Sequence, residues 1–167
     1  MTESILTERL ALLPLEVAHA EELAVALSDP ALHAFTGGEP LSVADLRTRF
    51  QRLVAGSPDP AVTWWNWVIQ RRASDELVGT VQATVTDDGG QAEIAWVVGT
   101  PWQGAGLASE AARALVDWLA GRGVRVIRAH VHPEHHASAA VAAAAGLVRT
   151  DEWHDGEVRW ERVLPGQ

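Results

Sequence analysis

The chain has 167 residues, 47% hydrophobic and 21% charged, with a formal net charge of -9 at pH 7 and a pI of about 5.1. This length and composition predict one globular domain spanning residues 1–167. The acidic balance argues against a nucleic-acid binder, because no basic stripe is present to neutralise phosphates, and it is compatible with an amine-bearing substrate. The absence of cysteine excludes disulfides, thiolate metal sites and a cysteine nucleophile.

The first twenty residues lack the basic stretch and apolar core of a secretory signal. The longest run of small apolar residues, ASAAVAAAAGL, is too short to span a bilayer. We therefore expect a cytoplasmic protein that binds neither membrane nor nucleic acid. The chain has eight tryptophans, and any that are exposed would suit a homodimer.

The chain begins with a short β-rich segment followed by two segments with helical periodicity. Apolar residues of the first helical segment recur along one helix face, and Ser42 followed by Asp45 resembles the cap of the second. The elements predicted here are a strand at Thr7–Leu13 and helices at Glu16–Leu27 and Val43–Val54.

A three-stranded meander is predicted next. Its last two strands flank the turn DDGG at 87–90, where Asp and Gly adopt positive φ at low cost. The predicted strands are Trp64–Gln70, Leu77–Thr86 and Ala92–Val98.

The last part of the chain alternates helix and strand. The predicted elements are helix Leu107–Leu119, strand Val124–Val131, helix Ala137–Ala145 with Gly146 as its C-terminal cap, and strand Val158–Leu164. The order β-α-α-β-β-β-α-β-α-β predicts a mixed α/β (α+β) domain, in which helices flank a largely antiparallel central sheet.

The segment PWQGAGLASEA, from Pro101 to Ala111, places a loop of small residues between a strand and a helix. The first N–H groups of a helix lack internal partners, and the helix dipole is positive at that end, so this layout suits an anion. No Lys-Ser/Thr pair follows the glycines, and the spacing of a dinucleotide fingerprint is absent. These residues alone leave open a plain turn and a phosphate cradle.

The same residues resemble a known family. QGAGLA fits the Gln/Arg-x-x-Gly-x-Gly/Ala signature of the GNAT N-acetyltransferase superfamily, and AEIAWVVGTPWQGAGLASEAARALVDWL resembles the family's strand, loop and helix. VHPEHHASAAVAAAAGLVRT resembles its downstream segment. TERLALLPL resembles the opening strand of the branch that acetylates the N-termini of ribosomal proteins and various small amines. The similarity covers roughly residues 7 to 163.

The resemblance implies acetyl-CoA as cosubstrate, without a metal. It implies that backbone amides of the loop bind the pyrophosphate, that main-chain groups of a splayed strand face the thioester, and that the downstream segment contributes further contacts. The cofactor-binding residues so implied are Val97, Val98, Gln103, Gly104, Ala105, Gly106, Leu107, Ala108, Ser109, His135 and Ser138. The chain departs from the family pattern in three places. His135 replaces an Asn, Ala142 stands where many members have a Tyr, and Gly146-Leu147 replaces Gly-Phe.

Acetyl transfer to an amine needs a neutral nucleophile, donors for the oxyanion and a group near the departing thiolate. Glu93 is the first candidate for the base, because partial burial on its strand would raise the pKa of its carboxyl. The alternative is a surface glutamate at the start of a hairpin strand. Ser138 is the candidate donor to the thiolate, and its alternative role is to satisfy the backbone at a helix start.

Other polar and aromatic groups admit further interpretations. His130, His132, His135 and His136 raise the question of a metal, but no ordered triad of ligands completes a motif. Trp65 and Trp67 share a strand face, where core packing competes with a substrate pocket. The segment from His33 to Gly38 is one that shapes the acceptor site in the resembled family.

Three functional hypotheses follow. The first is an acetyl-CoA-dependent N-acetyltransferase that acts on a primary amine, either a protein N-terminus or a small molecule. The second is a catalytically inactive acyl-CoA-binding module of the same fold, and the third is a histidine-metal hydrolase.

Overall fold

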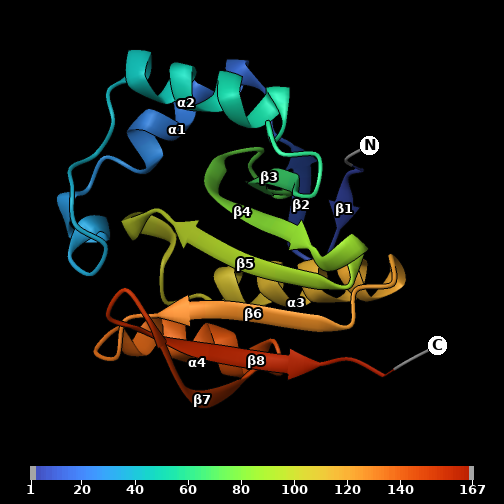
Figure 1. Cartoon of the computed structure of the whole chain (residues 1–167). Helices are drawn as coiled ribbons and strands as arrows, with labels where there is room; N and C mark the ends of the chain where they lie inside the picture. Colours follow the sequence, from blue (N-terminus) through green and yellow to red (C-terminus); the bar gives the residue numbers. More distant parts are fainter. Residues whose placement is uncertain (1–2, 166–167) are drawn as a thin grey trace.

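The computed structural model describes residues 3–165 and shows one mixed sheet with helices on both faces (Figure 1). The eight strands are ordered β1-β2-β3-β4-β5-β6-β8-β7. The strands are β1 (Ile5–Leu6), β2 (Leu10–Pro14), β3 (Thr63–Arg71), β4 (Leu77–Thr86), β5 (Gln91–Val98), β6 (Val126–Val131), β7 (Val148–His154) and β8 (Glu157–Val163). The α-helices are α1 (Ala20–Ala26), α2 (Val43–Ala55), α3 (Leu107–Gly121) and α4 (His136–Ala144). The 3-10 turns are η1 (Val17–His19), η2 (Pro30–His33), η3 (Asp87–Gly89) and η4 (Thr100–Trp102).

The predicted α/β class and largely antiparallel sheet are confirmed, since every pairing described is antiparallel except that of β5 with β6. The predicted caps are also present. The Ser42 hydroxyl accepts a hydrogen bond from the Asp45 N–H (3.1 Å), and Gly146 follows α4 with a φ of 87°. The turn at 87–90 joins β4 to β5 as expected, with positive φ at Asp87 and Asp88.

Three predicted elements differ from the structure. The predicted strand Thr7–Leu13 begins only at Leu10, as β2, and the short β1 before it was not predicted. The chain turns between them at Thr7, whose N–H donates to the Leu10 carbonyl (2.9 Å). The first helix begins as η1 before continuing as α1. Strand β7 is missing from the prediction: it is the edge strand, almost all of its residues are exposed, and it therefore lacks the alternating pattern of a half-buried strand.

The two faces of the sheet are covered differently (Figure 1). Helices α3 and α4 pack on one face, where Ile94, Leu115 and Ile127 belong to the main core. Helices α1 and α2 pack on the other face, but their core involves only the β2–β4 side of the sheet, through residues such as Val68 and Leu77. The α1/α2 face of β5, β6, β8 and β7 therefore carries polar side chains.

Strands β5 and β6 are paired over a short stretch. Their parallel register covers Gln91↔Val126, Ala92↔Ile127 and Glu93↔Arg128. Beyond Glu93, β5 continues to Val98 beside β4 alone, so the two strands splay apart as the resemblance implied. This opening between β5 and β6 is called the strand gap below.

The tryptophans serve mainly as core residues. Trp67 is fully buried, and the Trp65 and Trp67 rings make edge contacts with Trp118 of α3, at centroid distances of 5.4 and 5.0 Å. Core packing is thus the role of this pair, and the substrate-pocket reading is wrong. Within residues 3–165 only Trp153, on edge strand β7, falls in the exposed class, so it alone supports the homodimer expectation.

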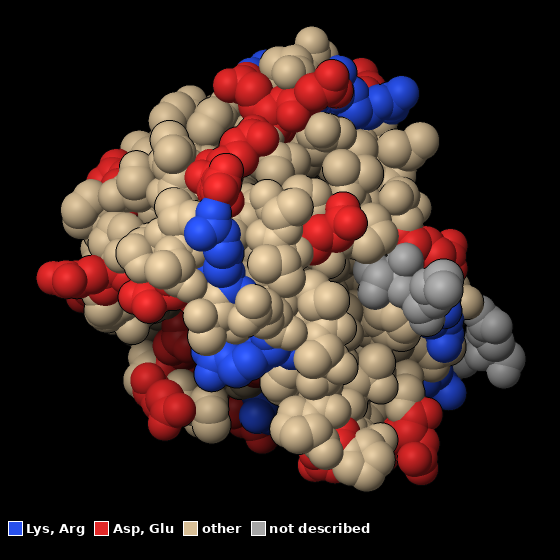
Figure 2. Space-filling model, turned by 90° about the horizontal axis from the view of Figure 1, so that it is seen from above, with Lys and Arg blue, Asp and Glu red and all other residues tan. Residues whose placement is uncertain are grey.

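Acidic and basic side chains are interspersed on one face of the molecule. In the view from above, acidic side chains lie at several separate places and basic side chains lie between them (Figure 2). None of the helices between residues 3 and 165 combines the length and apolar character that a bilayer crossing requires.

Candidate functional site

The loop after β5 presents a row of backbone N–H groups in front of helix α3. Gly104 and Gly106 have φ values of 82° and 79°, which favour glycine, and Gly106 is the N-cap of α3. Among the described residues, no hydrogen-bond acceptor is found for the N–H groups of residues 104–109. Residues 104–106 are exposed, whereas Leu107 is buried and Ala108 and Ser109 are half-buried, so the first of these donors, at the positive end of a 15-residue helix, lie at the surface.

Gln103 supports this loop from within. Its side-chain Nε2 donates to the Val98 carbonyl (2.9 Å), and its N–H donates to the Thr100 carbonyl (3.2 Å). The Gln103 amide that was expected to meet a pyrophosphate is therefore engaged inside the turn. The free donors begin at Gly104.

A cluster that the sequence did not predict fastens the loop to the opening strands. Arg9 Nη1 donates to the Ala105 carbonyl (2.7 Å), and Arg9 Nε contacts Glu110 Oε1 of α3 (2.7 Å). Glu110 also accepts hydrogen bonds from the Thr7 hydroxyl (2.5 Å) and the Arg9 N–H (2.9 Å). Burial opposes ionisation of Glu110, but the bonds from Thr7 and Arg9 outweigh it and hold the pKa of this carboxyl below its ordinary 4.5.

This lowered pKa predicts how stability depends on pH. A carboxyl with a depressed pKa in the folded state stabilises the fold above its unfolded pKa, and the contribution is lost as the pH falls through the folded pKa. Glu110→Gln should therefore lose about 1–2 kcal/mol of unfolding free energy at pH 7. The variant should also show a shallower decline than the parent below pH of about 4.5, measured by urea denaturation.

The control is Glu21→Gln, whose exposed carboxylate pairs with Arg47. Exposed pairs contribute little, so that variant should lose less than about 1 kcal/mol. A Glu110→Gln variant with the stability and acid sensitivity of the parent would contradict the role of the cluster.

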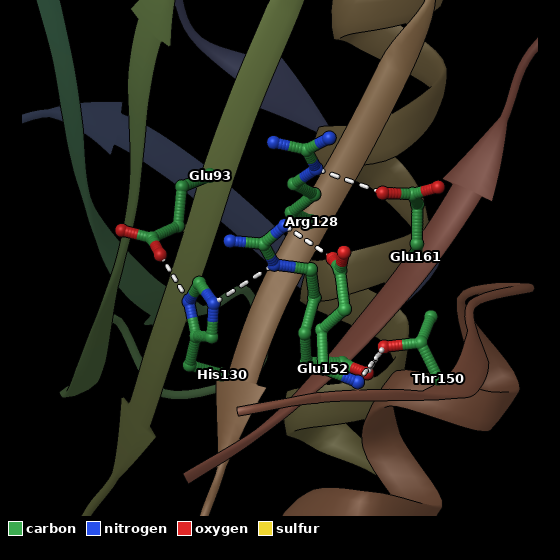
Figure 3. Close-up of polar contacts among 7 residues, drawn as sticks. Glu93, Arg128, His130, Thr150, Glu152 and Glu161 are labelled. Carbon is green, nitrogen blue, oxygen red and sulfur yellow. Dashed lines mark hydrogen bonds and ion pairs between the residues drawn. The ribbon is translucent and has the colours of Figure 1, made fainter. Parts of the chain in front are cut away.

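Glu93 lies on the polar face, beside the strand gap (Figure 3). Its side chain is 50% exposed, so the expected burial is not observed. The carboxylate is instead hydrogen-bonded to His130 Nδ1 of β6. His130 Nε2 lies 3.2 Å from Arg159 Nε of β8, and Arg159 Nη1 contacts Glu152 Oε2 of β7 (2.6 Å).

These contacts fix the proton positions on His130. A guanidinium only donates hydrogen bonds, so Arg159 makes Nε2 of His130 an acceptor. The neutral ring then carries its proton on Nδ1 and donates it to Glu93. Glu93 is thereby held as an oriented, half-exposed acceptor at the last position of β5 that pairs with β6.

The main chain of β5 presents unpaired groups to the strand gap. Gly99 N–H donates to the Val78 carbonyl of β4 (2.7 Å), whereas the Gly90 carbonyl accepts from Val126 of β6 (3.1 Å). N–H groups of a strand alternate in direction, so Trp96 and Val98 direct theirs into the gap and Val97 directs its N–H toward β4. Of the two strand residues predicted from the sequence, Val98 has the required direction, and Trp96 was missed.

The downstream segment lies across from this strand. His135 is the N-cap of α4, and its ring stacks on Phe35 at 4.5 Å, which joins the η2–α2 segment to the β6–α4 loop. Burial, followed by repulsion from His132 and His136, lowers the pKa of His135, so the ring is neutral at pH 7. Ser138 lies half-buried in the first turn of α4 and does not cap the helix. Ala142, where many family members have a tyrosine, is fully buried.

The histidines have individual partners. His132 Nδ1 accepts a hydrogen bond from the Glu134 N–H (3.1 Å), His130 contacts Glu93 and His135 stacks on Phe35. The structure between residues 3 and 165 contains no group of three or more His, Asp or Glu side chains arranged to hold a metal ion.

Known proteins resemble the chain in sequence and in fold. The acetyltransferase (GNAT) domain model matches residues 9–148. A Bacillus licheniformis protein named uncharacterized N-acetyltransferase p20 is 30% identical over 136 residues, which are 80% of this chain and 75% of that protein.

Two solved structures share the fold. A GNAT-family acetyltransferase from Bacillus anthracis superposes with a TM-score of 0.81 at 21% identity, covering 96% of this chain and 98% of the other. The ribosomal L7/L12 α-N-protein acetyltransferase RimL, solved with coenzyme A, superposes with a TM-score of 0.80 at 19% identity, covering 97% and 98%. The family model and the p20 relative together show that this chain belongs to the GNAT acetyltransferase family.

Proposed function

We propose that the protein transfers the acetyl group of acetyl-CoA to a primary amine, at a protein N-terminus or on a small molecule, by direct attack on the thioester. One observation carries the proposal: the unpaired edge of β5 leads directly into a loop whose N–H groups, from Gly104 to Ser109, lack acceptors among the described residues. This arrangement suits a ligand with phosphates at one end, which would meet the loop, and a narrow chain containing amide groups at the other, which would lie along the edge of β5.

The loop and the strand gap would each bind a different part of the cosubstrate. The N–H groups of residues 104–109 would hold the pyrophosphate, where the helix dipole adds to their attraction. The strand gap would hold the pantetheine arm, whose amides can pair with main-chain groups of Trp96 and Val98 as a neighbouring strand would. Bound acetyl-CoA supplies an activated acyl group on a thiolate leaving group.

Glu93 would accept the proton of the attacking amine, directly or through one water. The carbon–nitrogen bond would form first, which places negative charge on the carbonyl oxygen, and the carbon–sulfur bond would then break. One proton passes from the nitrogen to Glu93, and the coenzyme leaves as a thiolate. Main-chain N–H groups in the strand gap would stabilise the oxyanion. Ser138 is the proposed donor to the thiolate, because it lies half-buried in the first turn of α4, one turn before Ala142, and the chain has no tyrosine to supply that donor.

His130 and Arg159 would act as positioning residues. They touch Glu93 and one another rather than the reacting atoms, and they keep the carboxylate directed along the polar face (Figure 3). Arg128 and Arg159 are each paired with a glutamate on this face, whereas the Glu93 carboxylate has only the neutral His130 as partner. This uncompensated negative charge supports a cationic acceptor.

The comparisons are in keeping with this acceptor class, because one structural neighbour is an α-N-protein acetyltransferase of a ribosomal protein. Both a peptide N-terminus and a small amine are proposed as acceptors, which would approach along the polar face beside Glu93. We propose the cytoplasm as the location of the protein, where both kinds of acceptor occur.

Titration calorimetry with acetyl-CoA, with adenosine as comparison, tests the cosubstrate. Mass spectrometry of a panel of peptides and small amines then tests transfer. The chain contains no lysine, so modification of its own side-chain amines cannot obscure the result. Binding without turnover on any amine would replace the proposal by the acyl-CoA-binding module, and absence of binding would reject both.

A further inference from the structure

A cavity of about 360 Å³ opens beside the loop and brings three separate turns together. Gln103, Ala105 and Leu107 line it from the loop that ends at α3. Arg9 lines it from just before β2, and the end of β3 and the turn that follows contribute Arg71 and Arg72. The cavity therefore adjoins the loop that is proposed to hold the pyrophosphate.

Arginine dominates the charge of this cavity. Three of the thirteen arginines of an acidic chain line it, and Glu8 is the only acidic residue in the lining. With three arginines and one glutamate, the lining has a formal charge of +2 in a chain whose net charge is -9.

Most donors of these guanidinium groups are available. Arg72 donates from Nη1 to the Thr7 carbonyl (2.6 Å), and Arg71 makes only a long contact with Glu76 (3.4 Å). Arg9 uses Nε and Nη1 to fasten the loop. Each guanidinium carries five N–H donors, so Arg71 and Arg72 retain most of theirs for a ligand.

The chemistry that suits such a cavity is a phosphate monoester. Planar guanidinium groups bind phosphate through paired hydrogen bonds, and a monoester carries up to two negative charges. In coenzyme A, one ribose separates the 3′-phosphate from the diphosphate, so a cavity adjoining the diphosphate loop lies within its reach. The volume also falls within the range of pockets that hold small ligands, which is about 300–1,000 Å³.

We propose that Arg71 and Arg72 form a subsite for the ribose 3′-phosphate of coenzyme A, through which the protein distinguishes the coenzyme from its dephosphorylated form. This inference rests on the proposed function and adds a specificity to it. Arg9 borders the subsite, but its principal contacts are structural.

The test is calorimetric titration with coenzyme A and with dephospho-coenzyme A. The parent should bind coenzyme A about 10- to 100-fold more tightly, as expected for the loss of one or two charge-assisted hydrogen bonds. In the double variant Arg71→Gln/Arg72→Gln, the affinity for coenzyme A should fall to that for dephospho-coenzyme A. The affinity for dephospho-coenzyme A should remain within about twofold of the parent's, because none of its phosphates lies in the subsite.

Arg113→Gln/Arg149→Gln is the matched control, since it removes two exposed arginines outside the cavity lining. It should leave the preference for coenzyme A intact. Equal affinities of the parent for both ligands, or an equal loss of both in the double variant, would overturn the subsite and leave the proposed function standing. A parent that binds neither ligand would reject the proposed function together with the subsite.

Discussion

Replacing Glu93 by glutamine is expected to lower kcat about 100- to 1,000-fold at pH 7, the range expected for loss of a general base. Glutamine preserves the side-chain size and can still accept the hydrogen bond from His130, but it cannot take a proton from the amine. The affinity for acetyl-CoA should be unchanged. Steady-state kinetics over pH 6–10 measure the effect, which should diminish as the amine becomes neutral without help.

Glu161→Gln provides the matched control. It removes the same charge from the same face of the sheet, but Glu161 is bound to Arg128 (2.8 Å) rather than placed beside the strand gap. Its kcat should remain within a few-fold of the parent's. Equal rates for the parent and Glu93→Gln at every pH would remove Glu93 from the mechanism.

Replacing Gly106 by valine should weaken acetyl-CoA binding at least about 100-fold, the cost of losing two charge-assisted hydrogen bonds. The φ of 79° strains a β-branched residue. An added Cβ would also lie 3.3 Å from Nη2 of Arg9, the residue whose other nitrogens fasten the loop. The loop must then move away from the geometry that aligns its N–H groups. Calorimetric titration with acetyl-CoA measures the change in Kd.

The control for backbone strain is Gly123→Val, just beyond the other end of α3. Gly123 has a φ of 88° and nothing within 4 Å of an added Cβ. Both variants should lose about 1–3 kcal/mol of stability from the strained φ, but only Gly106→Val should lose affinity. Parent-like binding by Gly106→Val would show that the loop is a turn without a role in holding phosphate.

The sequence was sufficient to predict what depends on local chemistry. The period of α3, the cap at Ser42, the turn before β5 and the strand–loop–helix order around Gly106 are each written in a few adjacent residues. Strand β7 left a local signal that could have been used. The Asp155-Gly156 pair, with φ values of 50° and 81°, is a typical hairpin turn between β7 and β8.

Contacts between residues distant in the chain could not be predicted in this way. Arg9 meets Glu110 because β2 passes beside the start of α3, and Glu93 meets His130 because β5 and β6 are paired over only a few residues. Nothing near Arg71 or Arg72 in the sequence indicates that they share a cavity with Gln103. Each of these contacts depends on the tertiary fold, since Arg9 and Ala105 lie 96 positions apart in the sequence and Glu93 and His130 lie 37 positions apart.

The short pairing of β5 with β6 also bears on solubility. Unpaired strand edges normally occur at the rim of a sheet, where they invite pairing with other chains. Here an additional edge lies in the interior of the sheet, between two strands that α3 and α4 cover from one side. A strand of a second protein reaches an edge inside a sheet less readily than one at its rim, so this unpaired backbone should favour aggregation less than a free edge strand of the same length.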